Sequence, residues 1–165
     1  MTEQLASCYK GWDSYQQHLI RAIALLTSEQ LHLRAAPQLR SLCEQVAHMI
    51  AVRARWLYLD LHEGGAELDA LMNWDGWSAQ RGWEAPPVRS AAELVSGLET
   101  TWQVIQIALH RWTIADLDEV FPPPVPGEDT FTRQFALWHL IEHDLHHGGE
   151  LSFALGMHGL TGIPI

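Results

Sequence analysis

Apolar residues recur every three or four positions along most of this chain. A spacing of this kind places them on one face of an α-helix. It predicts four long helices, at residues 5–26, 42–62, 91–112 and about 130–155, and no stretch alternates in the manner of a strand. The first helix carries on one face Leu5, Tyr9, Trp12, Gln16, Leu19, Ile23 and Leu26.

Polar residues that favour helix ends mark several of these boundaries. Ser41 is followed three residues later by Glu44, and Ser90 is followed in the same way by Glu93. Both pairs have the spacing of a capping box, in which each side chain binds a free backbone N–H group of the other residue. Two glycines at residues 64–65 predict the end of the second helix.

Four long helices without strands indicate an all-α four-helix bundle. The chain has 165 residues, the length of one domain, so we expect a single domain over residues 1–165. The connections after the second and third helices are about 15–25 residues long, whereas short connections are usual in a bundle. Such long connections can form the walls of a pocket.

Composition and charge narrow the range of functions. Acidic residues number 20 and basic residues 10, which gives a formal net charge of −10. No cluster of Lys and Arg is visible, so we expect no binding of nucleic acid through bulk charge. No apolar run reaches the length of about 18 residues that spans a membrane, and the first residues lack the pattern of a signal peptide. Only Cys8 and Cys43 occur, which is too few for a disulfide framework. We therefore expect a cytoplasmic protein without membrane contact.

Four of the ten histidines lie in one segment, WHLIEHDLHHGGE, at residues 138–150. His143 and His147 are four residues apart, so on a helix their side chains project side by side. Two imidazoles with this spacing can both bind one metal ion at about 2.0–2.1 Å. Glu150, one turn further along, lies on the same face and could complete or support such a site.

The other residues of this segment point elsewhere or lie further away. His139 shares the face but lies one turn earlier, which suits a lining position. His146 and Asp144 project about 60° and 100° away from His143. The glycines at 148–149 each cost about 1 kcal/mol in a helix interior, which is typical of a place that another group approaches closely.

Two histidines leave a metal site incomplete, and a third ligand has to come from another helix. His48 borders the apolar face of the second helix, and His18 and His110 compete with it on pattern alone. A histidine pair at this spacing is also compatible with an ordinary core or surface role. The dinucleotide-binding, phosphate-binding and serine-nucleophile loop motifs are absent.

The chain resembles the DinB-like superfamily, which includes YfiT-like thiol transferases and mycothiol-dependent maleylpyruvate isomerases. Two segments carry the resemblance: SEQLHLRAAPQLRSLCEQVAHMIAVRARWL at residues 28–57 and FALWHLIEHDLHHGGELSFALGMHGL at residues 135–160. The resemblance spans essentially the whole chain. It implies a four-helix bundle with up-down-down-up order and long crossover loops.

The resemblance also implies a divalent metal ion bound by His48, His143 and His147, and we expect this ion to be zinc or nickel. It favours a homodimer, as does the apolar reverse side of the fourth helix. Many members of the family have Arg-Gly-Gln after the paired histidines, whereas this chain has Gly-Gly-Glu at residues 148–150. An anion-binding role of that arginine is therefore not expected here.

Three hypotheses of function follow. The first is a metal-dependent transferase that joins a low-molecular-weight thiol to an electrophilic small molecule, with no general base assigned. The second is a metal-dependent hydrolase, with Glu150 or Asp144 as the base. The third is a non-catalytic metal-binding or stress-response protein.

Overall fold

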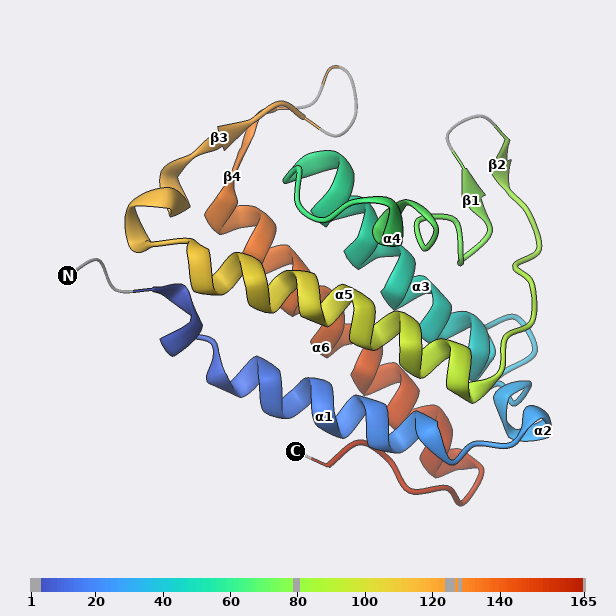
Figure 1. Cartoon of the computed structure of the whole chain (residues 1–165). Coiled ribbons are helices and arrows are strands. Elements are labelled where there is room, and N and C mark those ends of the chain that lie inside the picture. Colours follow the sequence, from blue (N-terminus) through green and yellow to red (C-terminus); the bar gives the residue numbers. More distant parts are fainter. Residues whose placement is uncertain (1–3, 79–80, 124–126, 128, 165) are drawn as a thin grey trace.

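The body of the molecule consists of four long helices. A computed structural model of the chain describes residues 4–78, 81–123, 127 and 129–164. The long helices are α1 (Lys10–Ala24), α3 (Leu42–Arg55), α5 (Ala91–Arg111) and α6 (Arg133–Met157). α1 and α6 run in one direction, and α3 and α5 run in the other (Figure 1). The molecule is thus an up-down-down-up four-helix bundle, as predicted.

Short elements precede α1 and fill the connections between the long helices. Helical turns among them are η1 (Leu5–Ser7), α2 (Ser28–Leu31), η2 (Trp56–Asp60), α4 (Ala66–Asp69) and η3 (Ile114–Asp118). Two antiparallel pairs of strands, of two residues each, are β1 (Trp77–Ser78) with β2 (Gly82–Trp83) and β3 (Val120–Phe121) with β4 (Phe131–Thr132). They lie in the two long connections, outside the bundle (Figure 1).

Capping side chains start several helices where the sequence predicts. Ser41 accepts a hydrogen bond from the Glu44 backbone N–H group and the Glu44 carboxylate accepts one from that of Ser41, which completes the first capping box. Ser90 forms the second box at the start of α5. Thr132 caps α6 by accepting a hydrogen bond from the backbone of Phe135. The ends of these helices are therefore set by local chemistry.

Two of the predicted helices differ from those observed. The first is interrupted, because Leu5 belongs to the separate turn η1 and donates its backbone N–H to Trp112 at 3.1 Å. The second is α-helical only to Arg55 and continues as one π-helical turn to Asp60. His62 then adopts a φ of 56° and ends the helix before the two predicted glycines. Single π-helical turns are frequent near functional sites.

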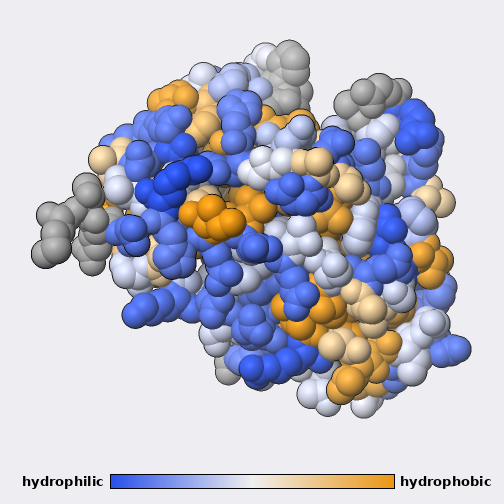
Figure 2. All heavy atoms as spheres, in the orientation of Figure 1, coloured by the Kyte–Doolittle hydropathy of each residue, from blue (hydrophilic) through white to orange (hydrophobic). Residues whose placement is uncertain are grey.

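The core lies between the helices, and α3 is its most buried member. α3 packs against both α5 and α6, while α1 packs against α5. The side chains of Val46, Met49 and Ile50 are all fully buried. The face over α1 and α5 is mostly hydrophilic, with apolar patches that are separate from one another (Figure 2). None of the helices in the described ranges has the length and hydropathy that a membrane crossing requires.

A tyrosine from α1 accounts for one of the two glycines in the middle of α6. A Cβ atom at Gly148 would lie 1.7 Å from the hydroxyl oxygen of Tyr15, whereas one at Gly149 would meet nothing within 4 Å. The Tyr15 hydroxyl donates a hydrogen bond to the backbone carbonyl of Asp144 at 3.3 Å. The group that comes close to α6 is thus the Tyr15 side chain of α1, and it fits there because Gly148 has no side chain.

This difference between the two glycines predicts different results for the same substitution. Alanine raises helix propensity by about 1 kcal/mol at either position. At Gly148 the new methyl group also displaces Tyr15, and overpacking of this kind costs about 1–3 kcal/mol. We expect urea unfolding to show that Gly148→Ala is less stable than Gly149→Ala by about that amount. Equal stability of the two variants would contradict this role of Gly148.

Candidate metal centre

A buried ion pair joins the two helices that carry the site. Arg53 of α3 and Asp144 of α6 are both fully buried. The guanidinium group donates two hydrogen bonds to the carboxylate, from Nε to Oδ1 at 2.8 Å and from Nη2 to Oδ2 at 2.7 Å. Because an isolated charge is very costly in a core, each group requires the other. The pair therefore fixes α6 in one position along α3.

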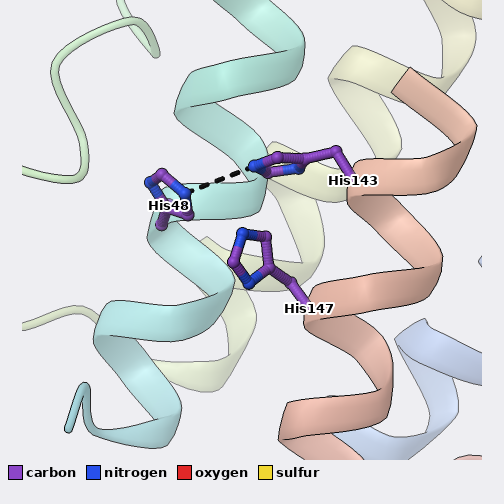
Figure 3. A group of neighbouring side chains, drawn as sticks. All are labelled: His48, His143 and His147. Carbon is purple, nitrogen blue, oxygen red and sulfur yellow. Dashed lines mark hydrogen bonds between the residues drawn. The ribbon is translucent and has the colours of Figure 1, made fainter. Parts of the chain in front are cut away.

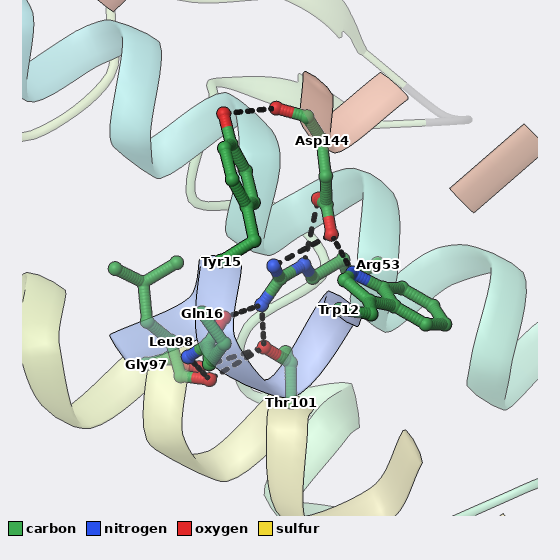
Figure 4. Close-up of polar contacts among 8 residues, drawn as sticks. All are labelled: Trp12, Tyr15, Gln16, Arg53, Gly97, Leu98, Thr101 and Asp144. Atoms are coloured by element: carbon green, nitrogen blue, oxygen red, sulfur yellow. Dashed lines mark hydrogen bonds and ion pairs between the residues drawn. The ribbon is translucent and has the colours of Figure 1, made fainter. Parts of the chain in front are cut away.

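The other two long helices complete the hydrogen bonding of this pair. From α1, Trp12 donates its indole N–H to Asp144 at 2.7 Å, and the Gln16 side-chain oxygen accepts a hydrogen bond from Arg53 at 2.8 Å. From α5, the hydroxyl group of Thr101 lies 3.4 Å from the Arg53 guanidinium. Figure 4 shows these groups converging from all four helices. The network holds the whole bundle in one arrangement.

Three histidines meet next to this network. His48 of α3 and His143 and His147 of α6 each offer one ring nitrogen, and these atoms all lie within 4.8 Å of one another. The Nε2 atoms of His48 and His143 are 3.3 Å apart. The ring of His147 lies 4.3 Å from that of His143 and 4.9 Å from that of His48, between centroids. Figure 3 shows the three rings directed toward a common point.

A loop residue supports the first of these histidines. The Nδ1 atom of His48 lies 2.9 Å from a carboxylate oxygen of Asp75, in the long connection between α3 and α5. Asp75 is itself bound by Arg55, which lies seven residues after His48 on α3. The side chain of Asp75 is only 2% exposed. His48 is thus held from the side opposite to the other two histidines.

Two polar side chains support the third histidine. The Nδ1 atom of His147 lies 2.7 Å from a carboxylate oxygen of Glu150 and 2.6 Å from the amide nitrogen of Gln45. Gln45 also donates a hydrogen bond to Glu150 at 2.7 Å. Glu150 therefore supports the histidine cluster from behind His147, which was one of the two roles expected of it.

Burial keeps the paired histidines neutral. It lowers the pKa of His143 well below its usual value, and the neighbouring His147 and His48 lower it further. Burial also lowers the pKa of His147, against an opposing effect of Glu150. For Glu150 burial raises the pKa, but the contacts with His147 and Gln45 outweigh it, so the net shift is downward. The α6 face thus offers neutral imidazoles with a carboxylate behind them.

The cluster fits a divalent metal ion. Two nitrogen atoms that bind tetrahedral zinc at about 2.0–2.1 Å lie about 3.3 Å apart. That is the distance between the Nε2 atoms of His48 and His143. Neutral imidazole nitrogen is also a donor that zinc, nickel, copper and iron all accept. These three histidines are the ones predicted from the sequence, and their role as ligands stays a prediction.

A cavity lies between α3 and α6, and none of the three clustered histidines is part of its wall. Its volume is about 450 Å³. Gln45 and Glu150, which contact His147, form part of its wall. The rest of the wall comes from both helices and from the preceding loop: Ala35, Gln38, Leu39, Arg40, Ser41, Leu42, Leu151, Phe153 and Ala154. A larger cavity of about 770 Å³ lies between α1 and α5, against Lys10 and His110, away from the three histidines.

The remaining histidines of interest lie outside the cluster. His18 lines a different cavity, between α1 and α6. His110 is exposed on α5, with its Nδ1 atom 2.7 Å from the carbonyl oxygen of Gln106. His139 is half-buried against Trp56, and their ring centroids are 4.7 Å apart. Its centroid lies 6.0 Å from that of His143, and it is not one of the three histidines whose nitrogen atoms converge.

The side chains of Asp144 and His146 lie outside the histidine cluster, although both residues are neighbours of its members in the sequence. The carboxylate of Asp144 is fully buried and bound by Arg53 and Trp12, so it cannot act as a base toward a substrate. His146 is exposed and lies 3.4 Å from Glu150. Together with His147 and Glu150 it forms a second group with a spacing suited to a metal, on the surface of α6.

Two supporting residues were not predicted from the sequence. Gln45 lies one turn before His48 on the same helix, so a search along that face of α3 could have found it. Asp75 lies in the connection between α3 and α5, in a tryptophan-rich loop that carries Trp74, Trp77 and Trp83. It follows His48 by 27 residues, and no periodic pattern connects the two. Its position depends on the fold of the connection itself.

Comparisons with known proteins agree with this fold. A family model described as the DinB superfamily matches residues 12–151. The chain belongs to the DinB superfamily. The match includes all three clustered histidines of this DinB-superfamily chain. No curated protein sequence matches it.

Two solved structures share the DinB-type bundle. A crystal structure of a DinB-like protein from Bacillus cereus is 20% identical, with a TM-score of 0.72 over 100% of this chain and 99% of the other. A DinB-like protein from Bacillus subtilis is 17% identical, with a TM-score of 0.61 over 92% of each chain. At these identities the likeness establishes the fold.

Because of the buried ion pair, we expect the replacement of Asp144 to destabilise the protein strongly. The replacement of Glu142, a nearby acidic residue, should have little effect. Asp144→Ala leaves the Arg53 charge buried without a partner, so we expect it to lower the free energy of unfolding by about 3–5 kcal/mol. Glu142→Ala, at a half-exposed position two residues earlier, should change it by less than about 0.5 kcal/mol. Urea unfolding measures both, and similar effects of the two substitutions would contradict the role of the pair.

Proposed function

We propose that this chain is a metal-binding protein that joins a low-molecular-weight thiol to an electrophilic small molecule. The observation that carries the proposal is the convergence of His48, His143 and His147 on one point. A cavity whose wall includes Gln45 and Glu150, the two side chains that contact His147, lies nearby. Their three neutral nitrogen donors suit zinc or nickel, and we propose one of these as the divalent ion.

The charge of the donor set supports this chemistry. Neutral imidazoles add no negative charge, so the site retains the full charge of a divalent ion. An ion held in this way favours the thiolate form of a bound thiol and lowers the pKa of a bound water. The burial of His143 and His147 keeps their rings in the neutral form that this role requires.

The cavity between α3 and α6 suits substrates of small size. Its volume of about 450 Å³ lies within the range of about 300–1,000 Å³ that is usual for small-molecule sites. Leu39, Leu42 and Phe153 give it apolar walls, while Gln45 and Glu150 form its polar side next to His147. In the proposed reaction the thiol loses its proton and a carbon–sulfur bond forms. The electron pair displaced from the electrophile departs with a leaving group or takes up a proton from solvent.

Metal-dependent hydrolysis is the second candidate function, and the position of Glu150 favours it. This carboxylate lines the cavity, is half-exposed and contacts His147. A glutamate is ionised at neutral pH, which is the form that accepts a proton from water. Of the two bases considered from the sequence, Glu150 is therefore the one retained.

A homodimer is proposed as well, through the outer face of α6. Trp138, Leu145 and Phe153 lie on this helix with more than half of their surfaces exposed. Large exposed apolar side chains along one helix are typical of an interface. Location in the cytoplasm and the absence of nucleic-acid and membrane partners stay predictions.

Removal of the metal tests the proposed function. Conjugation of a chromogenic electrophile to several thiols is measured with the protein as isolated, after chelation, and after addition of zinc or nickel. We expect activity to disappear with the metal and to return with it. His48→Ala should lose both metal content and activity, whereas His110→Ala, on the exposed face of α5, should keep both.

Other results would decide against the thiol reaction. Conjugation that survives complete metal removal would contradict it. Turnover of an ester or amide that needs the metal but no thiol would replace it by hydrolysis. A metal-loaded protein that lacks both activities would indicate a non-catalytic metal-binding role.

A further inference from the structure

Asp75 connects the tryptophan-rich loop to the histidine cluster. Although it lies between α4 and β1, its carboxylate is almost fully buried against α3. Oδ2 lies 2.9 Å from Nδ1 of His48 and accepts a hydrogen bond from Nη2 of Arg55 at 2.8 Å. Oδ1 accepts hydrogen bonds from Nη1 of Arg55 at 3.0 Å and from the backbone N–H of Trp77 at 3.2 Å. The four atoms that contact this carboxylate are thus all nitrogens, one from His48, two from Arg55 and one from Trp77.

Arg55 holds the loop that presents this carboxylate. It donates a further hydrogen bond to the backbone carbonyl of Met72 at 2.6 Å, and its guanidinium lies 5.0 Å from the centre of a Trp77 ring. The Arg55 guanidinium donates to both carboxylate oxygens and the backbone N–H of Trp77 donates to one of them, and neither group can accept a proton. Asp75 is therefore a carboxylate, which can only accept hydrogen bonds.

We infer that Asp75 is the positioning residue of His48: it holds the imidazole proton on Nδ1 and so keeps the lone pair of Nε2 directed at the cluster. A carboxylate at 2.9 Å requires a proton on Nδ1. In the neutral ring, the other nitrogen then carries the lone pair, and it is the Nε2 atom that faces His143 (Figure 3). The inference deepens the proposed function, because Nε2 is the atom that would bind the metal.

Asparagine at position 75 should reverse this arrangement. The amide keeps one oxygen, and the Oδ1 position faces two donors that cannot change, Arg55 and the backbone N–H of Trp77. The Oδ2 position faces Arg55 and His48, and His48 can move its proton to the other nitrogen. The amide oxygen therefore takes the Oδ1 position and its NH₂ group faces His48. The proton of His48 then lies on Nε2, where it blocks the lone pair.

The position of this proton is measured directly by ¹⁵N NMR of the histidine side chains. Spectra are recorded on the metal-free full chain at pH 8, with His48→Gln to assign the signals. We expect Nδ1 of His48 to be protonated in the parent and Nε2 to be protonated in Asp75→Asn. Glu63→Gln is the matched control, because Glu63 is also a buried carboxylate paired with an arginine, Arg111, away from the cluster. It should leave the His48 signals unchanged.

Zinc affinity gives the second readout, by competition with a chromophoric chelator. Loss of a group that orients a metal ligand costs about 10–100-fold in affinity, so we expect the Kd of Asp75→Asn to rise by that factor relative to Glu63→Gln. A parent in which Nε2 of His48 is protonated would overturn the inference, and this result does not depend on how Asp75→Asn folds. Equal zinc affinity of the two variants would also overturn it. A parent with the expected proton position that fails to bind zinc would instead refute the proposed function alone.

Discussion

The arrangement of this bundle depends on the ion pair between Arg53 and Asp144. Two charges removed from water are tolerated only when they are paired and when their remaining hydrogen bonds are satisfied. Here that condition is met by the two side chains together with Trp12, Gln16 and Thr101, so every long helix contributes. A shift of α6 along α3 would separate the charges. Because Asp144 directly follows His143, the same constraint sets where the paired histidines meet His48.

The direction of the helices explains why a loop can take part in the site. α3 and α5 run in parallel, so the chain has to return along the length of the bundle between them (Figure 1). The returning segment carries Asp75, and Arg55 anchors it through the carbonyl of Met72. His48 is thereby supported from a loop, while Gln45 and Glu150 support His147 from the helices themselves. The two sides of the cluster are held independently.

Local patterns in the sequence were sufficient for the four long helices and for the pair formed by His143 and His147. Apolar periodicity and capping boxes predicted the four helices and most of their ends, because both patterns depend on residues only a few positions apart. The spacing of His143 and His147 indicated a shared face, but the choice of His48 over His18 and His110 came from a family resemblance. Partners distant in sequence could not be found in this way. The pairing of Arg53 with Asp144, the contact of Tyr15 with Gly148 and the arrival of Asp75 all depend on the folded arrangement.

The account rests on the claim that His48, His143 and His147 bind one metal ion. An anomalous-difference map from crystals of the zinc-loaded protein tests it most directly. We expect a single peak per chain at about 2.0–2.1 Å from one nitrogen of each of the three histidines. His147 also belongs to the surface group with His146 and Glu150. The position of the peak therefore shows which of these two groups binds the zinc ion. A peak at that surface group, or none near His48, would contradict the account.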